Sequence, residues 1–249
     1  APVLQTVIDI GPKANWISIR GFVIEGCDGV AVNVRDSENC LIVGNTIHDT
    51  GGKLGGFAAV TVTGGRNCGV VGNDLYEICN DGIRLQSAWS ERHALDPIGH
   101  YADNNYLHHI GVLNGHGCGI SIRGTGLRVS HNLIHDTTRC GIFGGGHDCV
   151  GEYNHIRHVN LATNDTGAIY QCAASSGWRR RGNIIRYNYL HDIIGFGRNR
   201  GEYKPNFDAN GIYLDDSTCG THVHGNIVAR TSLAGIFVHG GSDHVIDNN

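Results

Sequence analysis

The sequence predicts an all-β chain that coils into a parallel β-helix, a solenoid of about eight to nine turns with loop inserts on one face. Three observations carry this prediction: a repeated Asn motif, a repeated Gly-Ile strand, and an alternation of apolar and other residues within each strand. Helical spacing of apolar residues is nowhere sustained over a dozen residues. No linker composition interrupts the chain, so we expect residues 1–249 to form a single domain.

The first repeat is an Asn that is followed, two positions later, by Ile, Leu or Val. It occurs at Asn45, Asn73, Asn105, Asn132, Asn154, Asn188 and Asn226, with an eighth copy expected at Asn248. Asn tolerates left-handed turn angles and its amide can bond to the next Asn in a stack, so this column predicts a structural ladder. Because the pattern still runs at residues 245–249, we expect a longer polypeptide, with further sequence or a partner capping the last turn.

The second repeat is a short strand such as Gly211-Ile212-Tyr213-Leu214, in which Ile212 and Leu214 would point into the core. Stacked strands lie ~4.8 Å apart, so equivalent residues of successive copies form columns on the outer face. The first outward column contains Arg84, Ser121, Phe143, Tyr170, Tyr213 and Phe237. The second contains Gln86, Arg123, Gly145, Cys172, Asp215 and His239.

Composition excludes two classes of partner. The formal net charge of −4 provides neither a basic patch for nucleic acid nor a basic helix for a membrane surface. No apolar run approaches the ~18 residues that a membrane-spanning helix needs. We therefore expect neither nucleic acid nor a membrane as a partner.

Cysteines and histidines also fall into columns. The nine Cys include no Cys-x-x-Cys pair, which favours free thiols stacked in the interior. His48, His108, His135 and His191 each follow an Asn of the ladder by three residues, and we expect them to be exposed in turns. Parallel side chains in a column do not converge on an ion, so the sequence predicts no metal site and no cofactor.

Three inserts interrupt the repeat, at residues 87–101, 173–181 and 195–207. The first two leave the coil after a Gly-Ile type strand and the third enters before one, so all three should border one face. The second insert contains Trp178 and the third contains Glu202.

Acids, arginines and aromatic rings on this face predict a sugar-binding groove. The catalytic candidates are Asp215, Asp216 and Asp165, and the candidates for substrate binding are Tyr170, Tyr213, Trp178, Arg84, Arg123, His239, Asp208 and Glu202. Matching residues 168–170 to residues 211–213 places Asp165 beside Asp208. Asp165 and Asp215 then lie about seven residues of ~3.3 Å apart, too far to cooperate unless the chain bends. We therefore expect Glu202 or His239 to be the partner of Asp215.

One part of the chain resembles a known family. The matching motifs are Asn164-Asp165-Thr166-Gly167-Ala168-Ile169-Tyr170, then Trp178, then residues 182–193, then Gly211-Ile212-Tyr213-Leu214-Asp215-Asp216. They resemble right-handed parallel β-helix carbohydrate-active enzymes, and are most similar to glycoside hydrolases of the fucosidase and xylanase type. The resemblance implies a secreted or periplasmic enzyme with Asp catalysts on this face. Where such sequences carry an Arg-Asp pair before the Trp, this chain has Ser176-Gly177.

Three functions remain open from the sequence. The first is a polysaccharide-degrading glycoside hydrolase with Asp215 or Asp216 as acid or nucleophile. The second is a polysaccharide lyase or uronate epimerase, in which acids bind Ca²⁺ and a residue within 179–181 takes a proton. The third is a non-catalytic solenoid that binds carbohydrate or serves as a structural fibre.

Overall fold

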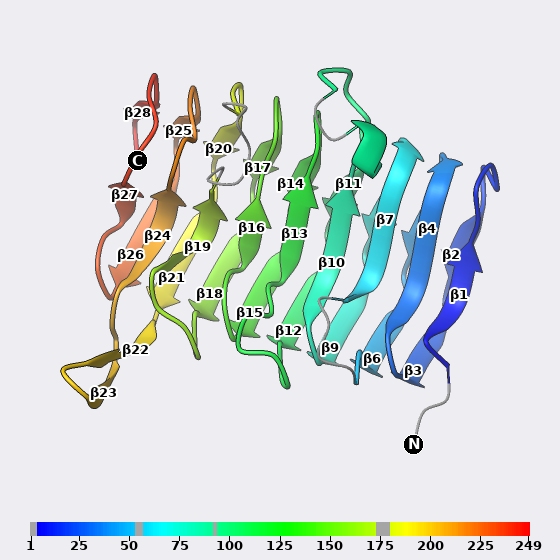
Figure 1. The fold of residues 1–249 in the computed structure, drawn as a ribbon, viewed down its shortest axis with the longest axis horizontal. Coiled ribbons are helices and arrows are strands. Elements are labelled where there is room, and N and C mark those ends of the chain that lie inside the picture. The colour runs from blue at the N-terminus through cyan, green and yellow to red at the C-terminus, as the bar shows by residue number, and fades with distance from the viewer. Residues whose placement is uncertain (1–3, 53–56, 92–93, 173–179) are drawn as a thin grey trace.

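The computed structural model describes residues 4–52, 57–91, 94–172 and 180–249 and confirms the predicted parallel β-helix. Each turn of the coil adds one strand to each of three parallel sheets, here named A, B and C (Figure 1). Within the described chain, sheets A and B have nine strands each and sheet C has eight, which confirms the expected number of turns. None of the described residues belongs to a helix that is long and apolar enough to cross a membrane.

The three sheets are made of the following strands. Sheet A contains β1 (Thr6–Ile10), β4 (Val30–Glu38), β7 (Ala58–Arg66), β10 (Asp81–Gln86), β13 (Ile120–Arg123), β16 (Ile142–Gly144), β19 (Thr166–Gln171), β24 (Ala209–Leu214) and β27 (Ile236–Val238). Sheet B contains β2 (Ser18–Arg20), β5 (Leu41–Val43), β8 (Gly69–Val71), β11 (Tyr101–Asp103), β14 (Arg128–Ser130), β17 (Val150–Glu152), β20 (Ile184–Arg186), β25 (His222–His224) and β28 (Val245–Asp247). Sheet C contains β3 (Val23–Cys27), β6 (Thr46–Thr50), β9 (Asp74–Ile78), β12 (Tyr106–Ile110), β15 (Leu133–Thr137), β18 (His155–Val159), β21 (Tyr189–Ile193) and β26 (Ile227–Thr231).

The first and third inserts border sheet A, as expected. The first insert, which contains the short 3-10 helix η1 (Trp89–Glu91), connects β10 to β11. Residues 173–179 of the second insert, between β19 and β20, lie outside the described residues. The third insert forms an antiparallel hairpin of β22 (Phe196–Asn199) and β23 (Glu202–Pro205) before β24. Figure 1 shows η1 above sheet A and the hairpin below it.

The core lies between the three sheets. Ile83, Leu85 and Ile120 are fully buried in it, as the alternation in their strands predicts. Seven of the nine cysteines are buried and all nine are free thiols, as predicted; Cys79 and Cys172 are partly exposed. The core contains Cys27, Cys40, Cys68 and Cys149, whereas Cys118 and Cys140 pack in a separate cluster with Tyr170 and Tyr213.

The Asn column forms the predicted ladder. The side-chain oxygen of Asn132 accepts hydrogen bonds of 2.9 Å from both the backbone N–H and the side-chain amide of Asn105, and the other steps repeat this pattern. The last step ends on Asn249, so the expected eighth copy at Asn248 is wrong. The register pairs His224 with Asp247, and the ladder residue follows each of these by two positions.

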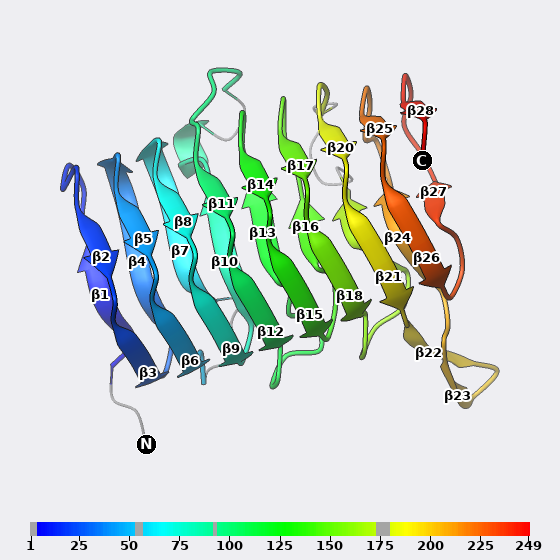
Figure 2. The same ribbon diagram turned by 180° about the vertical axis from the view of Figure 1, so that it is seen from behind.

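The histidine column differs from the expectation of exposed turns. His135 and His191 lie in β15 and β21 of sheet C, seen from behind in Figure 2, and both are buried. Outward side chains of this sheet cover one another: His48 stacks on Tyr76 with ring centroids 4.8 Å apart. Stacking at the strand spacing therefore removes from solvent residues that would be exposed on a single strand.

Candidate active site

The candidate site lies on the outer face of sheet A, over β19 and β24. Tyr170 and Tyr213 are register partners, as predicted, and their rings stack with centroids 4.9 Å apart and planes 12° apart. The hydroxyl of Tyr170 donates to Asp215 at 2.6 Å, and that of Tyr213 donates to Asp165 at 3.2 Å. One pair of stacked phenols therefore holds two of the three predicted catalytic acids.

The stacked tyrosines connect Asp165 and Asp215 indirectly, so the expectation that these two carboxylates lie too far apart for direct cooperation stays a prediction. The long tyrosine side chains bridge the separation along the strands. Asp165 also has a left-handed φ of 50°, which turns the chain where β19 begins. The charges of both carboxylates act on the Tyr213 phenol. Burial first, and then the charges of Asp215 and Asp165, raise the pKa of Tyr213.

Asp215 is 6% exposed and surrounded by donors. It accepts hydrogen bonds from Tyr170, from Nδ1 of His239 at 2.6 Å and from the backbone N–H of Asp216. Burial opposes its charge, but the donors outweigh burial and lower the pKa of Asp215. Asp215 therefore stays ionised at neutral pH.

His239 is the partner of Asp215, as one of the two sequence alternatives predicted. Its side chain is 56% exposed, and the hydrogen bond to Asp215 followed by the charge of Asp215 raises its pKa. Asp216 is exposed, with Oδ1 3.7 Å from the same His239 nitrogen. Glu202, the other alternative, is exposed in β23 of the hairpin.

Asp165 and Asp208 begin adjacent strands, as the sequence alignment predicted. The backbone N–H of Asp165 donates to the carbonyl oxygen of Asp208 at 2.8 Å, and both residues have left-handed φ angles. Asp165 is exposed and Asp208 is half-buried. Burial, followed by the charge of Asp165, raises the pKa of Asp208, so the carboxyls of the site differ in their affinity for a proton.

Tyr170 and Tyr213 differ from the predicted sugar-stacking surfaces, because they are only 6% and 3% exposed. Tyr170 contacts Tyr213, and the guanidinium of Arg139 lies 5.6 Å from the centroid of the Tyr170 ring. Burial and the hydrogen bond to Asp215 raise the pKa of Tyr170, so its phenol stays protonated as a donor. The partly exposed rings of this column are Phe143 and Phe237.

An arginine-rich cavity of about 380 Å³ adjoins the acids. Its lining residues are Asp81, Arg84, Gln86, Ser121, Ile122, Arg123, Phe143, Gly144, Cys172 and Arg180. It contains Arg84 and Arg123 of the predicted binding residues, whereas the predicted Trp178 lies outside the described residues. Asp81 was not predicted from the sequence, because it belongs to the start of an ordinary strand; Arg180 was considered only as one of residues 179–181 that take a proton in the lyase reading.

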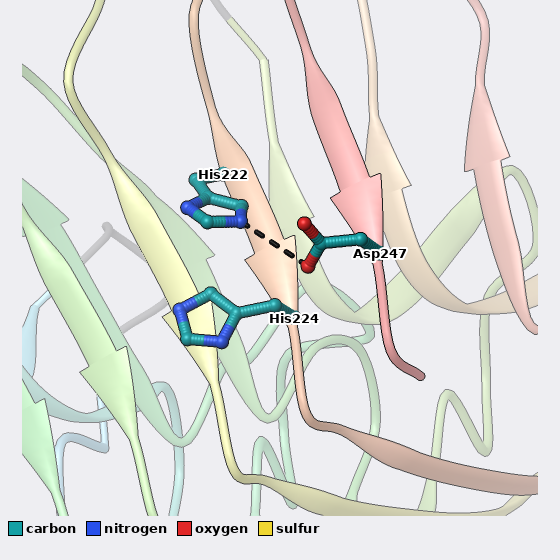
Figure 3. Close-up of side chains that lie close together, drawn as sticks. All are labelled: His222, His224 and Asp247. Atoms are coloured by element: carbon teal, nitrogen blue, oxygen red, sulfur yellow. Dashed lines mark hydrogen bonds and ion pairs between the residues drawn. The ribbon is translucent and has the colours of Figure 1, made fainter.

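Two groups of side chains bring potential metal ligands together, although the sequence predicted none. Cys172, Asp215 and Asp216 have ligand atoms within 4.8 Å of one another, but the oxygens of Asp215 already accept hydrogen bonds. The second group contains His222, His224 and Asp247 on β25 and β28 of sheet B (Figure 3).

In this second group, Nε2 of His222 lies 3.3 Å from Oδ1 of Asp247, and the two imidazole centroids are 4.2 Å apart. Two imidazoles and a carboxylate are donors that Zn²⁺, Ni²⁺ and Cu²⁺ accept. The sequence signal was the His-x-His spacing, which puts both rings on one side of a strand. This group lies on sheet B and is separate from the candidate site on sheet A.

The fold and the site define a class: a parallel β-helix whose outer face carries a cluster of carboxylates beside a cationic cavity. A family model described as "Right handed beta helix region" matches residues 58–249. The chain belongs to this family, and the right-handed sense of the predicted β-helix is thereby confirmed.

Solved structures share the fold at low sequence identity. A protein titled "Glycoside hydrolase" is 15% identical with a TM-score of 0.55, over 88% of this chain and 38% of that one. The receptor-binding domain of the Siphovirus 9NA tailspike is 11% identical with a TM-score of 0.56, over 95% of this chain and 41% of that one. An alginate lyase from Paenibacillus sp. str. FPU-7 is 12% identical with a TM-score of 0.52, over 89% and 79%.

The chain therefore spans less than half the length of the first two of these proteins. At these identities the likeness establishes the fold alone. No curated protein matches the chain by sequence.

Proposed function

We propose that this protein is a polysaccharide-degrading glycoside hydrolase whose acids are Asp215, Asp165 and Asp208. The observation that carries the proposal is that the stacked Tyr170 and Tyr213 hold the carboxylates of Asp215 and Asp165, while the pKa of Asp208, the backbone partner of Asp165, is shifted in the direction opposite to that of Asp215. Glycoside cleavage needs one protonated and one ionised carboxyl on either side of the bond. Environments that push the pKa values of neighbouring acids apart assign these two roles.

The ionised role falls to Asp215, whose donors lower its pKa. Its negative charge would stabilise the oxocarbenium-like transition state, and it also holds His239 in place at the exposed side of the site. The proton-carrying role falls to Asp208, because burial and then the charge of Asp165 raise its pKa. Asp208 would protonate the leaving oxygen.

One observation favours a lyase or uronate epimerase as the second candidate. The cavity beside Asp215 contains Arg84, Arg123 and Arg180, which could neutralise the carboxylate of a uronate. His239, half-exposed and held by Asp215, could then move the proton at C5 of the sugar. In this reading arginines replace the Ca²⁺ that the sequence analysis considered.

Product analysis on a panel of neutral and acidic polysaccharides tests the proposal. The variants Asp215→Asn, Asp165→Asn and Asp208→Asn are compared with Asp49→Asn, an exposed acid of sheet C that serves as a matched control. We expect new reducing ends from the wild type and the control, and rates at least about 100-fold lower from Asp215→Asn. Far-UV circular dichroism confirms that each variant is folded.

The other outcomes separate the alternatives. Ultraviolet-absorbing unsaturated products would identify the lyase. Rates within about threefold of wild type in all three site variants would contradict the assignment of the acids, since a lost acid or base costs about 10²-fold or more. Retained sugar binding with no product from any polysaccharide would support the non-catalytic solenoid instead.

The proposal includes a secreted or periplasmic location. A polysaccharide from outside the cell is too large to enter intact, so an enzyme that degrades such a substrate acts outside the cytoplasm. Cell fractionation followed by immunodetection tests this part, and recovery in the cytoplasmic fraction would contradict it.

A further inference from the structure

The arginine-rich cavity concentrates positive charge on a chain that is negative overall. Arg84, Arg123 and Arg180 carry three positive charges and Asp81 carries one negative charge, so the described residues of the lining have a net charge of +2 (3 − 1). The whole chain has a formal net charge of −4. A cavity with low-dielectric walls focuses such a local charge on a bound group.

Asp81 offsets only one of these arginines. Its Oδ2 accepts hydrogen bonds from Arg84 at 2.7 Å and from the hydroxyl of Ser121 at 3.1 Å, and its Oδ1 accepts from the backbone N–H of Cys118 at 3.0 Å. Asp81 is thus committed to three donors. It fixes Arg84 at the edge of the cavity.

Arg123 and Arg180 have no such partner among the side chains that the structure describes, where no carboxylate is paired with either guanidinium. Arg180 is partly buried and donates to the carbonyl oxygen of Cys172 at 2.9 Å. Burial and then the charge of Arg123 lower the pKa of Arg180. An anion between them would relieve both effects.

The rest of the cavity fits a sugar ring. Phe143 presents a partly exposed aromatic ring, and Gly144 leaves the floor without a side chain. Gly144 has a φ of 99°, and a Cβ there would lie 2.2 Å from the carbonyl oxygen of Ile122. An apolar wall opposite cationic donors suits a ligand that has both an apolar face and an acidic group.

Cys172 connects this cavity to the acids. It lines the cavity, and its Sγ belongs to the group of atoms that lies within 4.8 Å of the carboxylates of Asp215 and Asp216. A polymer chain bound across the acids would therefore place a neighbouring sugar unit in the cavity.

We propose that this cavity is a subsite for an anionic sugar unit, a uronate or a sulfated sugar, held by Arg123 and Arg180. The substrate of the enzyme would then be an acidic polysaccharide. This inference rests on the proposed function for its place in a reaction, but the cavity itself can be tested by binding alone.

The test is titration calorimetry with three tetrasaccharide probes: an oligogalacturonate, its carboxyl-reduced neutral counterpart, and a sulfated oligogalactan. Asp215→Asn, used as the background, prevents turnover. We expect at least one anionic probe to bind about 10-fold or more tightly than the neutral probe, and 0.5 M NaCl to reduce this preference. Preference for one anionic probe over the other identifies carboxylate or sulfate as the recognised group.

Charge-removing variants assign the preference to the cavity. Arg123→Gln and Arg180→Gln should each weaken anionic binding about 10- to 100-fold and leave the neutral probe unchanged. Arg123→Lys and Arg180→Lys retain the charge and should recover part of the affinity, which a folding defect would not allow. Arg20→Gln, at an exposed arginine of sheet B, is the matched control.

The outcomes keep this inference separate from the proposed function. Equal affinity for neutral and anionic probes, or a preference that survives both Gln variants, would overturn the subsite. If the enzyme also cleaves neutral polysaccharides, the proposed hydrolase would stand without it. Anionic binding that depends on Arg123 and Arg180 without any cleavage would support the subsite and contradict the hydrolase.

Discussion

Acidification should destabilise this protein through one buried histidine. His100 is fully buried; its Nδ1 accepts from the backbone N–H of Cys68 and its Nε2 donates to the carbonyl oxygen of Gly64, both at 3.1 Å. Burial lowers the pKa of His100 from 6.5 to about 4. The unfolded state therefore binds more protons than the folded state between these pH values, so stability is present above about pH 6.5 and lost toward pH 4.

The size of the effect follows from the shift. At pH 4 the histidine is almost fully protonated in the unfolded chain but only half-protonated in the folded protein. This difference lowers the unfolding free energy by about 3 kcal/mol relative to neutral pH. An asparagine in another turn makes the same two kinds of hydrogen bond as His100. Asn183 accepts from the backbone N–H of Cys149 and donates to the carbonyl oxygen of Gly146 at 3.0 Å. His100→Asn should keep both kinds of hydrogen bond and remove the titration.

The assay is urea unfolding of wild type, His100→Asn and the exposed control His116→Asn at pH 7 and pH 4. The loss of unfolding free energy on acidification should be about 3 kcal/mol smaller in His100→Asn than in the other two proteins. Equal m-values at each pH verify that the compared transitions expose the same surface. An equal loss in all three proteins would refute the reasoning, as would a directly measured pKa of His100 near 6.5.

Three further predictions concern the ladder, the cavity floor and the acids. Asn132→Ala should lower the unfolding free energy by about 3 kcal/mol, because buried donors of the preceding ladder residue lose their acceptor; urea unfolding that changes by less than about 1 kcal/mol would contradict this. Gly144→Ala should cost about 2 kcal/mol or more, because its Cβ would meet the carbonyl oxygen of Ile122; an unchanged thermal midpoint would show that the floor yields. Tyr170→Phe removes a donor whose hydrogen bond lowers the pKa of Asp215. The acidic limb of the pH–rate profile should therefore move to higher pH, and an unmoved limb would exclude this role of the phenol.

Sequence alone determined the β-helix and its columns. The spacing of the Asn motif and the alternation in the Gly-Ile strands are properties of a repeat, and stacking at a fixed strand distance turns such a repeat directly into contacts. That is why the pairing of Tyr170 with Tyr213 and of Asp165 with Asp208 could be predicted before the structure was known. The end of the ladder was placed one residue early, because the register of the last strand is not fixed by the motif.

Only the tertiary structure decided how the site is assembled. A column places a Cα atom, but the direction and reach of a side chain depend on its neighbours, so the bridge from Tyr213 to Asp165 could not be read from spacing. The burial of Tyr170 and Tyr213 also depends on neighbouring side chains, which cover ring faces that a single strand would expose. The cavity joins Asp81 to Arg180, which are far apart in the sequence, because Arg180 lies beside turns of the coil that precede it in the chain. The conformation of an insert depends on what it packs against in three dimensions. The periodic pattern of the repeat contains no information about that packing.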